Sequence, residues 1–422
     1  MDTAGLSLDQ APPITIPFKY FLTAALFSIA VGLLFTLHGG DVMSSRWSPL
    51  ALGITHLITV GFLAQVMTGA MMQLLPVLAG SPIPKVVVVS WVVHLSLLVG
   101  TALLVFGFLS SRELLLIAGG ITLSAAFLIL LMSTGMALLR SKSHRHTVRT
   151  LGFGWTALAP TVILGGYLVA GLAGLTQVAE MQKIVTLHLS WGLLGWTGIV
   201  LFTTIFELVP MFYVAPGFPV LIKHWSLPSV FLLLVILTLS NFMPGAFLKA
   251  SLVLIAMTFF VIGCYVLSIV YRRKRLIVDT TLLFIWTGVG SLLLAVVVWL
   301  SGGNDLLLGG LLLGGVCLTI PIGIIYKVIP FLCWFHLQGL LIRREKFDHT
   351  VPSMKCFIKE KEAKRQYMLH LIALCLLLMA SQLPNPFAMP AGAVFLFSSL
   401  YLFKNILYAY IVFHNERRIL NS

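Results

Sequence analysis

Five histidines of this 422-residue sequence lie inside long apolar stretches: His56, His94, His188, His336 and His370. An imidazole among apolar side chains needs a hydrogen bond or a metal to offset its loss of water. Haem iron accepts imidazole from one or two helices, whereas copper or zinc needs two or three converging imidazoles. We therefore expect His56 and His188 to ligate haem or a metal ion, with copper as the second candidate after haem.

The same histidines have a simpler interpretation, in which each ring only hydrogen-bonds to a neighbouring helix. Hydroxyl groups close to His56 and His188 in the sequence are those of Thr55, Thr59 and Ser190. For His94 and His370 the simple hydrogen bond is the favoured interpretation, although both are also candidate cofactor ligands.

A second set of polar residues, Gln73, Glu207 and Lys327, lies within apolar stretches, each three positions before a proline. The prolines are Pro76, Pro210 and Pro330. Ionisable groups inside a membrane are rare and costly, and an ion pair between Glu207 and Lys327 would reduce that cost for both. The alternative is that Glu207 is a proton-relay carboxyl group. We expect the prolines to kink their helices and free carbonyls for polar side chains.

The elements that must position these residues are membrane-spanning helices. Hydrophobic residue types make up 59% of the chain and charged types only 9%, compared with about a quarter charged in soluble domains. At about 20 apolar residues per spanning helix, the chain has room for roughly twelve. The composition therefore predicts an all-α, polytopic membrane protein that forms a single integral membrane domain over residues 1–422.

The predicted spans are separated mostly by short connections. They are 17–37, 50–75, 86–108, 113–139, 150–174, 185–213, 227–244, 249–271, 277–300, 305–336, 367–385 and 389–413. One connection, 337–366, is long, rich in lysine and arginine, and too polar to cross a membrane. We expect it to form a basic cytoplasmic loop.

The positive charge of the chain is distributed unevenly over these spans. With the N-terminus inside, 21 of the 27 lysines and arginines fall on inner segments, four on outer segments, and Lys327 and Lys404 inside spans. This asymmetry follows the positive-inside rule and predicts cytoplasmic termini in a bacterial-type inner membrane. The net charge of +14 then needs no nucleic acid, and anionic lipid is the expected partner of the basic loops.

The spans also show a threefold internal repeat of four helices each. The repeats cover approximately 17–139, 150–275 and 277–415. The second helix of each repeat is long, glycine-rich and carries one of the polar residue and proline pairs described above. His56 and His188 lie 20 and 22 residues before their prolines, which predicts equal depths. The alternative is coincidence, because glycine and proline are common in membrane helices.

Five glycines in the first two of these long helices bear on cofactor binding. They are Gly61, Gly69, Gly192, Gly195 and Gly198. Because glycine has no side chain, we expect these positions to leave room for a flat macrocycle beside the histidines.

With twelve helices in three four-helix units, both ends inside and a histidine near the outer end of the second helix, the chain resembles the catalytic subunit of haem-copper oxidases and nitric-oxide reductases. It also resembles the NnrS family of haem- and copper-containing membrane proteins. These resemblances imply that His56 matches a haem ligand and that His188 matches a copper ligand. They further imply electron transfer or the handling of nitric oxide or oxygen, which would make an enzyme of this kind an oxidoreductase.

The chain also departs from the oxidase pattern. The span 227–244 lacks the two adjacent histidines of that family, and the span 305–336 has only His336, at its inner end, in place of a His-x-His pair. The surroundings of Glu207 differ from the family pattern as well. A complete copper–haem centre is therefore not encoded, and the expected function is a haem-binding membrane protein on an oxidase-like scaffold.

Two other functions remain open. The repeats, the interrupted helices and the charges Glu207 and Lys327 are also compatible with a small-solute transporter or channel. A cofactor-free assembly or scaffold subunit would use the 337–366 loop to bind a partner. A redox partner or a second copy of the chain would fit the first function. The sequence carries no nucleotide-binding or soluble hydrolase motif.

Overall fold

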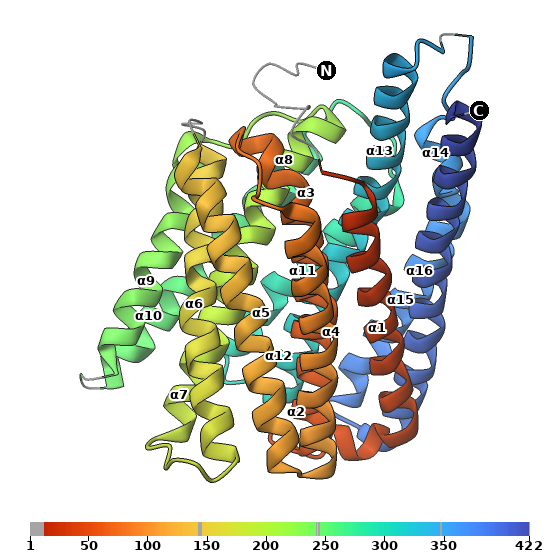
Figure 1. Cartoon of the computed structure of the whole chain (residues 1–422). Helices are drawn as coiled ribbons and strands as arrows, with labels where there is room; N and C mark the ends of the chain where they lie inside the picture. Colours follow the sequence, from red (N-terminus) through yellow and green to blue (C-terminus); the bar gives the residue numbers. More distant parts are fainter. Residues whose placement is uncertain (1–11, 142–145, 242, 244, 347, 422) are drawn as a thin grey trace. The chain divides into compact units, whose positions relative to one another are not determined.

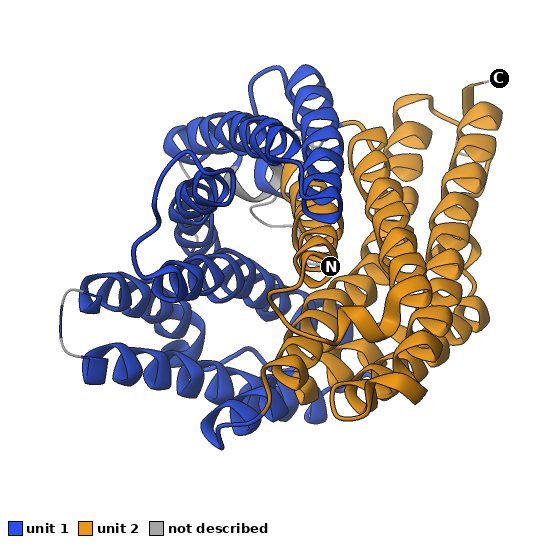
Figure 2. Ribbon diagram, turned by 90° about the horizontal axis from the view of Figure 1, so that it is seen from below, with its two compact units in different colours: residues 1–12, 74–277, 292–303 blue, residues 13–73, 278–291, 304–422 orange. Residues whose placement is uncertain are grey.

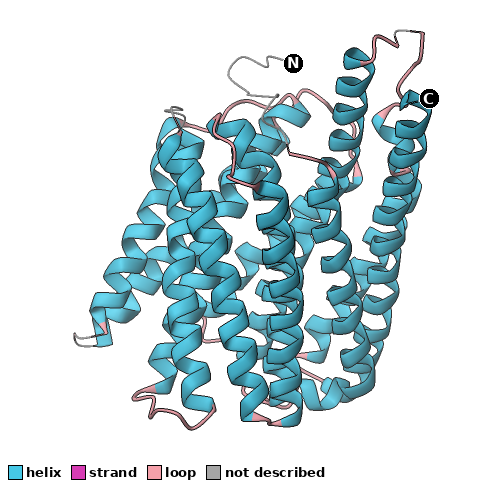
Figure 3. Cartoon of the chain, in the orientation of Figure 1, coloured by secondary structure: helices cyan, strands magenta, loops and turns pink. Residues whose placement is uncertain are grey.

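The computed structural model describes residues 12–141, 146–241, 243, 245–346 and 348–421. Within these residues every regular element is a helix and none is a strand (Figure 3). Twelve of the described helical segments are long and apolar enough to cross a membrane. The predicted all-α, polytopic class is therefore confirmed.

Figure 1 labels the α-helices, numbered in chain order; the π-helical segments, denoted η, lie between them. The first half comprises α1 (Thr15–Val42), α2 (Pro49–His56), η2 (Leu57–Ala64), α3 (Gln65–Ala79), α4 (Val86–Ser110), α5 (Glu113–Arg140), α6 (His146–Leu172), α7 (Met181–Leu189), η3 (Ser190–Gly198) and α8 (Ile199–Tyr213). The second half comprises η4 (Ile222–Ser226), α9 (Leu227–Ser240), α10 (Gly245–Tyr271), α11 (Thr280–Leu300), α12 (Asp305–Gly309), η5 (Gly310–Leu318), α13 (Thr319–Arg343), α14 (Met354–Phe357), α15 (Glu360–Ala380) and α16 (Pro384–Asn421).

The predicted basic loop 337–366 is shorter in the structure than the sequence indicated. Helix α13 continues to Arg343 and α15 already begins at Glu360, so the connection is 344–359 and itself contains α14. Hydropathy detects only the apolar part of a helix, and these helices continue with polar residues beyond that part. The same reason explains why α16 extends to Asn421.

The described chain forms two compact units, neither of which is one continuous stretch of the sequence (Figure 2). Unit 1 consists mainly of residues 74–277 and 292–303, and unit 2 of residues 13–73, 278–291 and 304–421. Unit 2 thus combines the beginning of the chain with its end. The single domain and the boundaries of the three sequence repeats stay predictions.

Helices α1 and α16 pack side by side in unit 2, with glycines at their contact. A Cβ atom at Gly39 would lie 2.7 Å from the backbone nitrogen of Met389. The rings of Phe18 and Tyr410 lie 5.3 Å apart, so the beginning of α1 lies beside the end of α16. Small residues permit such close packing of spanning helices, and the two helices run antiparallel.

Three spanning helices share one local structure. Each has a short α-helix, then a π-helical segment, then a longer α-helix with an internal proline. The three are α2–η2–α3 with Pro76, α7–η3–α8 with Pro210, and α12–η5–α13 with Pro330. This common order supports their equivalence. π-Helical segments are rare and occur frequently at functional sites.

The first prediction tests the close contact between α1 and α16. Gly39→Ala should lower the free energy of unfolding by about 1–3 kcal/mol, because the added methyl group overpacks the backbone of α16. The neighbouring Gly40→Ala is the control, since its Cβ atom would lie 3.6 Å from Asn385 Oδ1 and alanine favours a helix. Thermal unfolding midpoints in detergent compare the two variants, and equal midpoints would contradict this packing.

Candidate functional site

His56 is the last residue of α2 and directly precedes the π-helical segment η2. Its Nδ1 atom lies 2.8 Å from the carbonyl oxygen of Leu52. A carbonyl oxygen only accepts hydrogen bonds, so in the neutral ring the proton is on Nδ1 and the lone pair is on Nε2. Histidines that ligate metals are commonly held by such a hydrogen bond from the other ring nitrogen. The tautomer of His56 is therefore the one that a histidine adopts when it ligates a metal through Nε2.

His188 has the same tautomer in unit 1. It lies two residues before η3, and its Nδ1 atom is 3.0 Å from the carbonyl oxygen of Thr161 on α6. Gly165 leaves space for the ring, since a Cβ atom there would lie 3.0 Å from the Cε1 atom of His188. The sequence of α6 therefore provides both a carbonyl and a gap for this imidazole, and the lone pair is again on Nε2.

The third helix with this local structure, α12–η5–α13, differs at the corresponding position. Gly309 lies 21 residues before Pro330 and directly precedes η5. A Cβ atom at Gly309 would meet no other atom within 4 Å. Two of the three equivalent helices therefore present an imidazole at this junction, and the third presents open space.

The two remaining candidate ligands are buried. His94 on α4 lies in unit 1, with its ring edge-on to Trp91 at 6.0 Å. His370 on α15 lies in unit 2, with its Nε2 atom 2.8 Å from the hydroxyl oxygen of Thr319. For His370 the structure shows the hydrogen bond that the simpler interpretation expected.

The prediction that five glycines leave room for a macrocycle is wrong. A Cβ atom at Gly61 would lie 2.7 Å from the ring of Phe27, and one at Gly69 would lie 2.7 Å from Tyr20 Cβ. The spaces beside Gly192, Gly195 and Gly198 are filled by Thr161, Ala157 and Phe259. Glycine serves at these positions to bring helices close together, a role that composition alone does not distinguish from a cavity.

Glu207 and Lys327 have other partners than the pair that the sequence suggested. In unit 1 the Lys223 ammonium group lies 2.8 Å from Glu207 Oε1, and the Thr147 hydroxyl donates to the same oxygen at 2.6 Å. Lys223 comes from η4 and Thr147 from α6, so Glu207 joins three elements. Gln73, the third residue of the set, is buried at 3% exposure.

Lys327 forms an ion pair with Asp279 in unit 2, with 2.6 Å between Nζ and Oδ2. The two side chains are only 15% and 16% exposed. The other carboxylate oxygen of Asp279 accepts from the backbone N–H of Leu282 at 3.1 Å, at the beginning of α11. Sequence reasoning missed Asp279. The signal was its position as the acidic residue at the start of the span 277–300, because a buried lysine needs a counter-charge.

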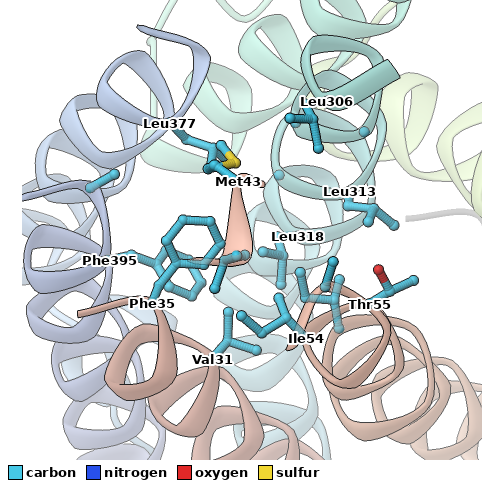
Figure 4. Close-up of a pocket in the computed structure, with 18 of the residues that line it drawn as sticks. Val31, Phe35, Met43, Ile54, Thr55, Leu306, Leu313, Leu318, Leu377 and Phe395 are labelled. Atoms are coloured by element: carbon cyan, nitrogen blue, oxygen red, sulfur yellow. The ribbon is translucent and has the colours of Figure 1, made fainter. Parts of the chain in front are cut away.

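An apolar cavity of about 150 Å³, partly open at the surface, lies in unit 2 between α1, α2–η2, α12–η5, α15 and α16 (Figure 4). Helix α2 contributes Ala51, Ile54 and Thr55 to its wall. Their spacing of three and four residues defines one face of the helix, and His56 does not belong to that face. His370 does line the cavity.

Metal chemistry is constrained by how these groups are distributed. In the part of the chain that the structure describes, no group of three or more histidine, cysteine, aspartate or glutamate side chains is placed to hold a metal ion. A copper or zinc ion needs several protein ligands, whereas haem brings four nitrogens of its own and needs one or two. Single imidazoles therefore suit haem better than an isolated ion.

Comparison of the sequence with models of protein families and with curated proteins finds no match. The resemblance to haem-copper oxidases and to the NnrS family therefore rests on the helix count, the repeat and the position of His56.

The second prediction tests the buried ion pair of Lys327 and Asp279. Asp279→Asn keeps an oxygen to accept from the Leu282 N–H but leaves the Lys327 charge without its counter-charge. Breaking a buried pair in this way costs about 3–5 kcal/mol of stability, measured as a fall in the thermal unfolding midpoint.

Glu180→Gln provides the matched control for this measurement. Glu180 pairs with Lys183 at 2.7 Å on an exposed surface, where an ion pair contributes less than about 1 kcal/mol. A loss as small for Asp279→Asn as for Glu180→Gln would show that the Lys327–Asp279 pair does not stabilise unit 2.

Proposed function

We propose that this protein is a haem-binding, multi-pass membrane protein with an oxidase-like scaffold, which acts in electron transfer or in the handling of nitric oxide or oxygen. One observation carries the proposal. His56 and His188 lie at the same α-to-π junction of two equivalent helices, and both hold a proton on Nδ1 by bonding to a main-chain carbonyl oxygen. Both rings therefore direct a lone pair from Nε2, as a ligand of haem iron does.

The donor set fits haem, whereas the glycines do not provide the room for it. His56 lies off the face of α2 that lines the cavity, so a macrocycle bound to His56 would approach α2 on another face. Bound haem supplies a one-electron redox centre, and the protein holds the imidazole in place through Leu52. Copper at His188 is the less favoured alternative, because copper needs further ligands.

The proposal places the protein in a bacterial-type inner membrane, with both termini in the cytoplasm. The inside excess of lysine and arginine supports this orientation. Its partners would be a redox protein or a second copy of the chain, together with the bilayer. A surface groove on α15 and α16 supports anionic lipid as a further partner, because Lys361, Lys364 and Arg365 line it beside Met368.

The third prediction concerns the absorption spectrum. Protein purified from a haem-producing host should show a Soret band in the oxidised form that shifts on reduction. His56→Ala should lose or shift that band, because the iron loses its imidazole. Haem content per protein, measured on the same samples, distinguishes loss of haem from a change of ligand.

His336→Ala is the control for the spectrum. His336 also bonds through Nδ1 to a carbonyl oxygen four residues earlier, that of Leu332 at 2.9 Å, but it lies far from the α-to-π junction of its helix. Its variant should keep the native spectrum. Protein that is folded but carries no haem, or equal spectral changes in the two variants, would overturn the proposal.

A second candidate function is transport of a small solute or of protons. It is favoured by the charged residues in the spanning helices that a π-helical segment interrupts. Glu207 and Lys327 each lie three residues before the proline of a helix that is also interrupted by a π-helical segment. Ionisable residues at such places commonly mark ion or proton pathways. Glu207 is the candidate proton-relay carboxyl group of the two, and its partner Lys223 lies on the short segment η4.

The fourth prediction separates this candidate from haem binding. In proteoliposomes containing the pH-sensitive dye pyranine, a proton transporter should change the internal pH. Glu207→Gln should abolish that change, whereas His56→Ala and the exposed control Glu180→Gln should leave it intact. Absence of any proton movement with the native protein would exclude proton transport as its function.

A further inference from the structure

The hydrogen bonds around His370 define its tautomer. The Thr319 hydroxyl lies 2.8 Å from the carbonyl oxygen of Gly314 and 2.8 Å from the Nε2 atom of His370. A hydroxyl has one hydrogen, and a carbonyl oxygen only accepts, so that hydrogen goes to Gly314. The hydroxyl oxygen therefore accepts from Nε2–H of His370, and the lone pair of this ring is on Nδ1.

The Nδ1 atom of His370 is a buried acceptor that has no hydrogen-bond partner among the described residues. The side chain is 2% exposed and lies between the rings of Phe284 and Phe395. An unsatisfied acceptor in an apolar interior is unfavourable, and native proteins rarely leave one. His370 also lines the cavity of unit 2, which makes an occupant of the cavity the candidate for the missing donor.

The rest of the cavity wall limits what that occupant is. Most of the lining is apolar and includes Phe35, Leu313 and Leu377 (Figure 4). The charged lining groups Arg46 and Asp305 lie 3.4 Å apart and pair with each other. A buried water needs two to four polar partners, whereas an engineered apolar cavity of about this size in another protein binds benzene. The wall therefore suits an apolar ring with one donor better than water or an ion.

We propose that the cavity of unit 2 binds an uncharged aromatic alcohol, whose ring occupies the apolar space and whose hydroxyl donates to Nδ1 of His370. The site is distinct from the proposed haem ligand, because His56 does not belong to the face of α2 that lines the cavity. Binding at His370 and haem at His56 can therefore fail independently.

The experiment compares phenol with toluene, which has nearly the same shape but no donor. The full-length chain is purified in detergent, and its thermal unfolding midpoint is followed as each compound is added, since a ligand of the folded state raises the midpoint. Phenol should bind the native protein roughly five- to a hundred-fold more tightly than toluene, the range expected for one hydrogen bond to a buried acceptor.

His370→Phe keeps a ring of similar size and removes Nδ1. This variant should bind phenol no better than toluene, while its toluene affinity stays native. His336→Phe is the matched control, because it makes the same substitution at a half-buried histidine outside the cavity, and it should keep the native preference. Because all variants share one detergent, partition of the compounds into micelles does not affect the comparison.

A second variant keeps the proposal testable if His370→Phe does not fold. Ala373→Leu fills the cavity from α15 and keeps His370, and it should weaken the binding of both compounds. Equal affinities of the native protein for phenol and toluene, a preference for phenol that survives in His370→Phe, or no saturable binding of either compound would each overturn the proposal.

Discussion

Polar side chains within the apolar helices of this protein must find their partners inside the protein, because the hydrocarbon of a bilayer offers none. His56 and His188 satisfy Nδ1 with main-chain carbonyl oxygens. Lys327 satisfies its charge with Asp279. Each solution also fixes the direction of the side chain, and for the two histidines it fixes which nitrogen keeps its lone pair. The functional proposals depend on that choice of nitrogen.

The three helices that contain a π-helical segment do not all carry the same residue where that segment begins. Each changes from an α-helix to a π-helix near its beginning and contains a proline further on. The junction carries an imidazole in two of them and Gly309 in the third, beside the cavity that His370 also lines.

Much of the fold follows from hydropathy, because a helix in lipid is apolar along its whole span. The twelve spans and the positions of Glu207 and Lys327 before their prolines were evident on that basis. The partner of Lys327 was not, since Asp279 lies 48 residues away and only packing brings the two together. The prediction that the glycines leave room for a macrocycle was wrong for a related reason. A glycine such as Gly61 is compatible with a cavity or with a close contact between helices, and only the position of Phe27 decides between them.

The central claim is that the Nε2 atom of His56 ligates haem iron, and chemical rescue tests it most directly. In His56→Gly, free imidazole has room to take the place of the missing side chain at the iron. The account predicts that the variant has an altered haem spectrum and that added imidazole restores the native one. A variant that keeps the native haem spectrum without imidazole, or a folded native protein without haem, would contradict it.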